Sequence, residues 1–105
     1  MEEKRLYFRM KNNGEMRAFI SHVALDVIEI SSNGALVIKK SVHLPSAGVI
    51  EIHINNFAIN VNYEILRTDK DAMVLVFINE EQINALFVVL KHLRDERKRK
   101  ARKSS

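Results

Sequence analysis

Cysteine is missing from this sequence of 105 residues, and so are several marks of common protein classes. Without cysteine the chain can form no disulfide framework, no cysteine-based zinc site and no thiol nucleophile. No apolar run approaches the roughly 20 residues that cross a bilayer. The first residues, MEEKR, lack the apolar core of a signal peptide. We therefore expect a cytoplasmic protein with no transmembrane segment.

Recognisable catalytic and metal-binding motifs are also lacking. The sequence has four histidines: His22, His43, His53 and His92. No two of them are three or four residues apart, as two metal ligands on one helix would be, and the motif HExxH does not occur. No GxSxG, Walker or GxGxxG pattern is present. The sequence thus predicts no catalytic residue, no metal site and a non-enzymatic protein.

Positive charge is concentrated at the C-terminal end of the sequence. The formal net charge is +4, but residues 94–103 hold seven of the 17 basic side chains and two of the 13 acidic ones. The remainder therefore has ten basic and eleven acidic side chains, so the body is not a general polyanion binder. Binding of nucleic acid or of an anionic membrane by the tail 94–103 is a hypothesis that we do not favour, since a solvated helix end explains the same charges.

An apolar fraction of 47% is sufficient for a core, and the pattern between residues 16 and 78 is that of strands. Residues 49–54 and 57–65 alternate apolar and polar side chains, which is typical of half-buried antiparallel strands. Residues 73–78 are almost wholly apolar, as in a central strand. About six short strands separated by turns predict a small mainly β barrel or sandwich.

The pattern changes to helical at Asn79. Asn79 is a good helix N-cap, and Gln82 three residues later completes a capping-box pattern. Apolar side chains then follow helical spacing, and we expect them to cover one mouth or one flank of the barrel: Ile83, Leu86, Phe87, Leu90 and Leu93. We expect fraying beyond residue 93, because nothing apolar anchors the helix there. The predicted organisation is a flexible basic arm (1–14), a barrel with its helix (15–93) and a basic tail (94–105).

Residues 29–35, EISSNGA, join two strand-like runs and predict a tight turn, in which Gly34 is expected to supply a positive φ. A hairpin turn alone would explain this stretch. However, Glu29 and Ser31 are two residues apart, so their side chains point to one face of the strand end. A carboxylate and a hydroxyl on one face can accept hydrogen bonds from the edge of a planar base.

A second candidate group lies in the arm, where Lys4 and Arg5 precede Arg9 by five and four residues. Two guanidinium groups can bind phosphates through paired hydrogen bonds and can stack on bases. A solvated arm would explain this pair equally well when it is considered alone.

Taken together, Arg5-x-x-x-Arg9 followed by Glu29-x-Ser31-x-x-Gly34 in a β-rich chain resembles the PilZ domain, whose pattern is RxxxR and then [D/N]xSxxG. The resemblance covers nearly the whole chain. It implies a six-stranded antiparallel barrel with a C-terminal α-helix, acting as a bacterial signalling receptor or adaptor for cyclic di-GMP, in regulation such as that of motility or biofilm formation. By the same resemblance, Lys4, Arg5, Arg9, Glu29, Ser31 and Gly34 bind this ligand.

Glu29 departs from the family pattern, which has Asp or Asn at this position. The carboxylate is retained, but it stands on a side chain longer by one methylene, and we expect weaker binding. A charged hydrogen bond contributes about 1.5–3 kcal/mol, roughly ten- to hundredfold in affinity, and a misplaced acceptor loses much of this contribution. The alternative is an adaptor of the same fold that binds no nucleotide and contacts an unidentified protein effector, for example through Val88 or Val89.

Overall fold

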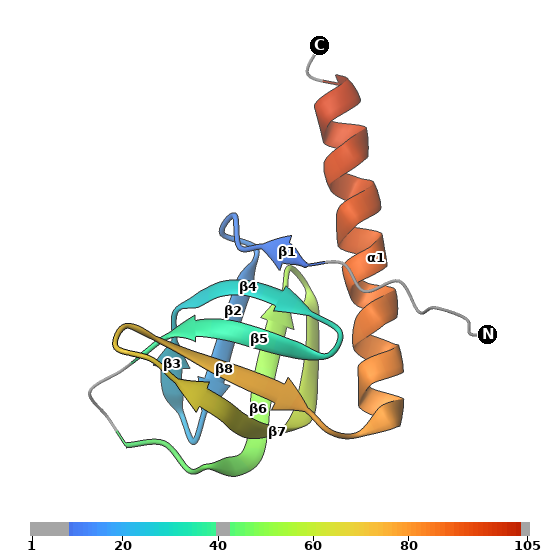
Figure 1. Cartoon of the computed structure of the whole chain (residues 1–105). Helices are drawn as coiled ribbons and strands as arrows, with labels where there is room; N and C mark the ends of the chain where they lie inside the picture. The colour runs from blue at the N-terminus through green and yellow to red at the C-terminus, as the bar shows by residue number, and fades with distance from the viewer. Residues whose placement is uncertain (1–8, 40–42, 104–105) are drawn as a thin grey trace, which may run out of the picture.

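The computed structural model describes residues 9–39 and 43–103, and in them the chain forms eight strands and one helix (Figure 1). The elements are β1 (Met10–Lys11), β2 (Met16–Ile20), β3 (Val23–Leu25), β4 (Val27–Ser31), β5 (Gly34–Ile38), β6 (Ala47–Ile54), β7 (Phe57–Thr68), β8 (Ala72–Phe77) and α1 (Glu80–Lys103). The strands form one antiparallel sheet in the order β1-β4-β5-β8-β7-β6-β2-β3. This sheet curls into a half-barrel beside α1.

The mainly β class and the C-terminal helix are confirmed, but the prediction of six strands is wrong, because the structure has eight. One additional strand arises because the apolar run from Val23 to Ile30 is divided at Asp26 into β3 and β4. The other is β1, in which Met10 and Lys11 pair with Ile30 and Glu29 of β4. Both additional strands are short, and β1 and β3 are the two edges of the sheet that the described residues form.

Alternating side chains place the core on the concave side of the sheet. In β6, Ile50, Ile52 and Ile54 are buried, as the alternation predicted. β8 lies between β5 and β7, which confirms the prediction of a central strand. The apolar stripe of α1 covers this core, with Ile83, Leu86, Leu90 and Leu93 buried.

The start of α1 confirms only half of the predicted capping box. Asn79 is the N-cap, because its Oδ1 accepts a hydrogen bond from the backbone N–H of Gln82 at 3.0 Å. The Gln82 side chain, however, turns to β7, where its Oε1 accepts from the backbone N–H of Asn62 at 2.7 Å and its Nε2 donates to the Asn62 side chain at 3.0 Å. Gln82 therefore attaches the helix to the sheet.

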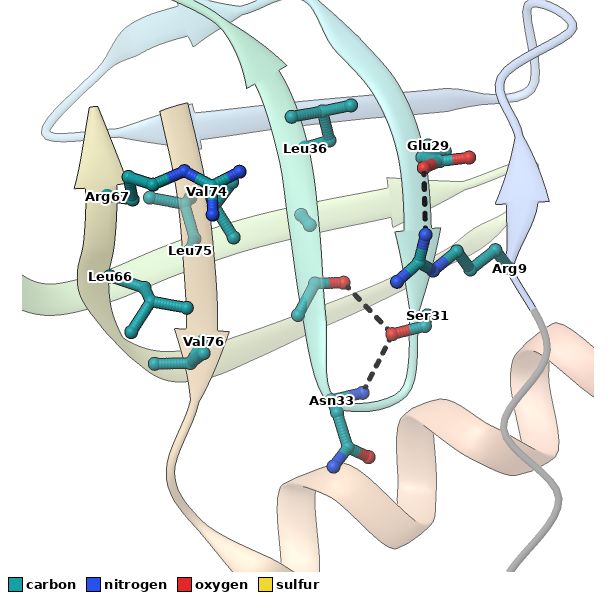
Figure 2. A pocket seen from close by; sticks show the side chains of 12 residues that line it. Arg9, Glu29, Ser31, Asn33, Leu36, Leu66, Arg67, Val74, Leu75 and Val76 are labelled. Carbon is teal, nitrogen blue, oxygen red and sulfur yellow. Dashed lines mark hydrogen bonds and ion pairs between the residues drawn. The ribbon is translucent and has the colours of Figure 1, made fainter. Parts of the chain in front are cut away.

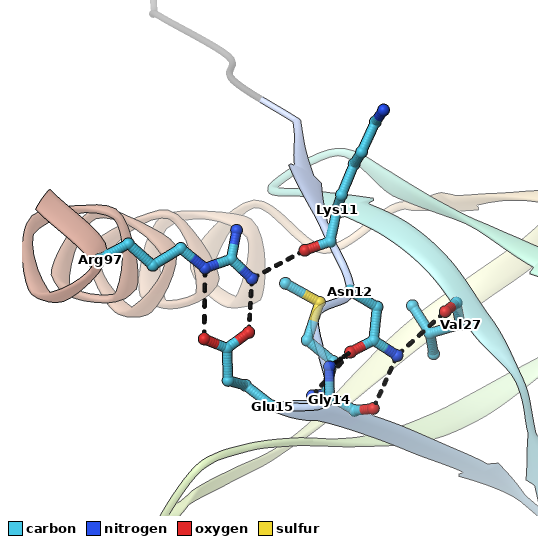
Figure 3. Close-up of polar contacts among 7 residues, drawn as sticks. Lys11, Asn12, Gly14, Glu15, Val27 and Arg97 are labelled. Carbon is cyan, nitrogen blue, oxygen red and sulfur yellow. Dashed lines mark hydrogen bonds and ion pairs between the residues drawn. The ribbon is translucent and has the colours of Figure 1, made fainter. Parts of the chain in front are cut away.

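The helix continues through most of the predicted basic tail, to Lys103. Its anchor there is polar rather than apolar. Arg97 donates hydrogen bonds to the Glu15 carboxylate and to the backbone oxygen of Lys11, so that the helix is joined to the segment that carries β1 (Figure 3). Within the described residues, no helix is long and apolar enough to cross a membrane.

Candidate functional site

A pocket of about 390 Å³ lies on the outer face of the sheet, over the neighbouring strands β4, β5, β8 and β7 (Figure 2). Its lining residues are Arg9, Glu29, Ser31, Asn33, Gly34, Ala35, Leu36, Leu66, Arg67, Val74, Leu75 and Val76. Four of the six residues predicted from the sequence to bind the ligand are among them: Arg9, Glu29, Ser31 and Gly34. The other two, Lys4 and Arg5, lie outside the described residues.

The orientation of Glu29 depends on an irregularity in β4. The pairing of β4 with β5 shifts register between Val27 and Glu29, which is where a β-bulge interrupts alternation. Val27 and Ile30 are buried in the core, whereas Glu29 is only partly buried and lines the pocket. The carboxylate is thereby directed to the same side as the Ser31 hydroxyl, as expected from their spacing of two.

Ser31 shapes the turn and also faces the pocket. Its Oγ accepts a hydrogen bond from the backbone N–H of Asn33 at 3.2 Å and lies 3.5 Å from the Gly34 oxygen, to which it donates. The neighbouring Ser32 is buried, and its hydroxyl bonds the Asn33 side chain at 3.2 Å. The turn is thus held by its own side chains, and Asn33 adds an amide to the pocket wall.

Gly34 is required at this turn for a reason other than the predicted one. Among the described residues, Gly14 is the only glycine with a positive φ, so the expectation of a positive φ at Gly34 is wrong. A Cβ atom at Gly34 would instead lie 2.3 Å from the backbone oxygen of Leu75 in β8. The turn needs glycine because the β5 backbone passes unusually close to β8.

Arg9 brings positive charge to the same corner. Its Nη1 lies 3.8 Å from Glu29 Oε2, and its side chain is 76% exposed, so the guanidinium group remains accessible to solvent. The pairing of β1 with β4 positions Arg9, which immediately precedes β1. The part of the predicted arm that the structure describes is therefore held on the same side of the sheet as Glu29 and Ser31.

Asn12 holds the segment that connects β1 to β2 (Figure 3). Its Nδ2 donates to the backbone oxygens of Met16 and Val27, each at 3.0 Å, and its Oδ1 accepts from the N–H groups of Gly14 and Met16. These bonds join the turn after β1 to both β2 and β4. The segment between β1 and β2 is therefore a connection that keeps β1 against the sheet.

The sequence reasoning missed Leu66 and Arg67, which form the wall opposite Arg9. The clean alternation recognised in the sequence ends at Ile65, and β7 continues for three further residues. The Arg67 guanidinium lies 3.4 Å from Asp69, and its side chain is 63% exposed. The sequence offered one indication of this part of the site, an arginine between the alternating run and the next turn. Arginine at such a position is common on protein surfaces, so it did not identify a binding residue.

The described residues contain no group of three or more His, Cys, Asp or Glu side chains that could hold a metal ion. The most acidic part of the pocket is the single carboxylate of Glu29, which already has a cationic neighbour in Arg9. The pocket combines two guanidinium groups, one carboxylate, one hydroxyl and an apolar floor. This set of groups can bind an anion and a flat polar ring.

Fold and pocket together define the class: a small antiparallel half-barrel with a C-terminal helix and a polar corner at the β4–β5 turn. The chain belongs to the PilZ-like family, whose model, described as PilZ domain-like, matches residues 9–98. The match begins at Arg9, so Lys4 and Arg5 precede it. Domains of this family are generally non-enzymatic receptors.

A solved structure supports the fold independently. The crystal structure of an uncharacterized Legionella protein is similar to this chain with a TM-score of 0.85 and 45% sequence identity. The similarity covers 87% of this chain and 98% of the Legionella protein. A search among curated proteins found no match.

Proposed function

We propose that this chain is a non-enzymatic receptor domain that binds cyclic di-GMP through the pocket at the β4–β5 turn. The observation that carries the proposal is that Arg9, Glu29 and Ser31 line one pocket, although Arg9 is 20 residues from Glu29 in the sequence. Membership of the PilZ-like family supports the same class of ligand. As such a receptor, the chain would act in bacterial cytoplasmic signalling, for example in control of motility or biofilm formation.

The chemistry of the corner suits a guanine nucleotide. The Glu29 carboxylate can accept hydrogen bonds from the N–H groups of a guanine edge, and the Ser31 hydroxyl can accept or donate beside it. The Arg9 guanidinium can pair with a phosphate through two hydrogen bonds or stack on the base. In this proposal Lys4 and Arg5 complete the phosphate contacts. The bound ligand then orders the arm against the sheet, which changes the surface available to an effector protein.

Calorimetric titration with cyclic di-GMP, beside GTP and cyclic GMP, tests the proposal. We expect heat with cyclic di-GMP and a loss of at least about tenfold in affinity for Arg9→Ala and for Ser31→Ala. Arg17→Ala is the matched control, because Arg17 is exposed on β2 and does not line the pocket. A folded wild-type protein that gives no heat with cyclic di-GMP contradicts the proposal.

The alternative is an adaptor that binds no nucleotide, and one surface favours it. Val88 is 51% exposed on α1, and a groove of about 370 Å³, which Val89 rather than Val88 lines, runs between the helix and the β6–β7 turn. Phe57 and Val89 give this groove an apolar lining. The adaptor function is supported if the wild-type protein gives no heat with nucleotides but binds a partner protein. The Val88→Asp variant should then no longer bind that partner.

A further inference from the structure

The bulge in β7 makes two consecutive side chains line the pocket. In register with β8, Ile65 is opposite Leu75 and Arg67 is opposite Val74, so Leu66 has no partner of its own. Neighbouring side chains in a regular strand point to opposite faces. Because the bulge breaks this alternation, Leu66 and Arg67 both belong to the pocket wall (Figure 2). Bulges commonly redirect side chains beside functional sites.

Leu66 extends an apolar floor that is otherwise half-buried. Leu36, Val74 and Val76 form this floor from β5 and β8. Leu66 at its edge is 62% exposed, which is the largest exposed fraction among the large apolar side chains of the described residues. A single exposed leucine is ordinary. Here, however, it continues a concave apolar surface that has room for a flat ring.

The two arginines lie at opposite ends of this floor, with β4, β5 and β8 between them (Figure 2). Each is near one carboxylate, Arg9 at 3.8 Å from Glu29 and Arg67 at 3.4 Å from Asp69. Strong charge-assisted hydrogen bonds are about 2.7–2.9 Å long, so both pairs are loose. Each guanidinium can therefore turn toward an anion in the pocket at small cost.

We propose that Leu66 and Arg67 bind the second half of a cyclic dinucleotide, which rests on the function proposed above. The Arg9, Glu29 and Ser31 corner takes one base and one phosphate. The apolar floor with Leu66 covers the face of the other half, and Arg67 pairs with the second phosphate or the second base. Arg67 is then a specificity-determining residue, because a ligand must extend from β4 across β5 and β8 to β7 to contact both the corner and Arg67.

The test is calorimetric titration of cyclic di-GMP into wild-type protein, Arg67→Gln, Arg67→Lys and Leu66→Ala, with Arg17→Gln as the control. We expect Arg67→Gln to lose about tenfold in affinity, Arg67→Lys to lose less because it retains the charge, and Arg17→Gln to match the wild type. Unchanged melting temperatures show that the variants fold. NMR of the leucine methyl groups provides a second readout, in which cyclic di-GMP shifts the Leu66 signals of the wild-type protein.

The outcomes separate this inference from the function on which it rests. If Arg9→Ala loses affinity while Arg67→Gln binds as the wild type does, the second half-site is overturned and the receptor proposal stands. Leu66 methyl signals that do not move at saturating ligand overturn it in the same way. A wild-type protein without affinity for cyclic di-GMP overturns the receptor proposal itself, and the half-site with it.

Discussion

Arg97, in the last part of α1, and Glu15, just before β2, are 82 positions apart in the sequence and form an ion pair with two hydrogen bonds (Figure 3). The same guanidinium donates to the backbone oxygen of Lys11 at 2.8 Å. The side chains of Arg97 and Glu15 are 24% and 20% exposed, so the pair is better shielded than an ordinary surface ion pair. It joins the C-terminal helix to the segment that places Arg9 at the pocket.

Removing this pair should destabilise the protein modestly. We expect Arg97→Ala to lower the free energy of unfolding by about 1 kcal/mol. Exposed ion pairs contribute up to about that amount, and this ion pair has two hydrogen bonds and is largely shielded from solvent. The melting temperature should then fall by about 4–8 °C. Arg99→Ala is the control, since Arg99 is exposed on the same helix. Equal melting temperatures for the two variants would show that the pair contributes nothing.

The same pair predicts a pH dependence of stability. The hydrogen bond from Arg97 holds the pKa of the Glu15 carboxyl below its usual value of 4.5, although partial desolvation opposes this. Since the folded-state pKa is the lower one, the contribution of Glu15 is complete above about pH 4.5 and is lost as the pH falls through the lowered pKa.

Urea unfolding of wild type and Glu15→Gln between pH 7 and pH 3 measures this contribution. The difference in free energy of unfolding between the two proteins should be constant near neutral pH and should shrink in acid. Other carboxyl groups titrate in both proteins, so the difference isolates Glu15. A difference that stays constant down to pH 3 would contradict the assignment.

Gly34 provides a prediction with a matched control. In Gly34→Ala the added Cβ would lie 2.3 Å from the Leu75 oxygen, and we expect a loss of about 1–3 kcal/mol in the free energy of unfolding. In Gly48→Ala the nearest atom is in the Tyr63 ring at 3.5 Å, an ordinary contact, and the loss should be much smaller. Chemical denaturation compares the two variants, and a Gly34→Ala protein as stable as Gly48→Ala would refute the close-approach explanation.

Glu29→Asp tests the departure from the family pattern. The shorter carboxylate restores the pattern residue and moves farther from Arg9, which is then available to the ligand. If cyclic di-GMP binds at this corner, we expect Glu29→Asp to bind about tenfold more tightly than the wild type and Glu29→Ala to bind more weakly. Calorimetric titration measures both. Tighter binding by Glu29→Ala than by Glu29→Asp would mean that the carboxylate does not contact the base.

Side chains with regular periodicity made part of the fold predictable. The alternating isoleucines at 50, 52 and 54 are buried as expected, because burial of one face is what such patterns encode. In the helical stripe Ile83, Leu86, Leu90 and Leu93 are buried, whereas Phe87 is only partly buried. The strand number was not predictable in this way. β1 has two residues and no pattern, and it exists only because β4 provides an edge with which it can pair.

Part of the candidate site was predictable for the same reason. Glu29 and Ser31 were placed on one face by their spacing of two, and both line the pocket. Arg67 was not found, since the bulge that directs it to the pocket depends on how β7 pairs with β8. The reason for glycine at position 34 was also predicted wrongly, because a close approach between two backbone segments cannot be recognised from the local sequence.

The amino-acid sequence by itself determined a β-rich domain with a C-terminal helix and a Glu–Ser–Gly turn, because local periodicity and turn chemistry act over a few residues. Only the tertiary structure decided that Arg9 and Arg67 lie at opposite ends of one pocket and that Arg97 pairs with Glu15. Those relationships follow from the strand order β4-β5-β8-β7 and from the docking of α1, which bring together residues that no short-range pattern connects.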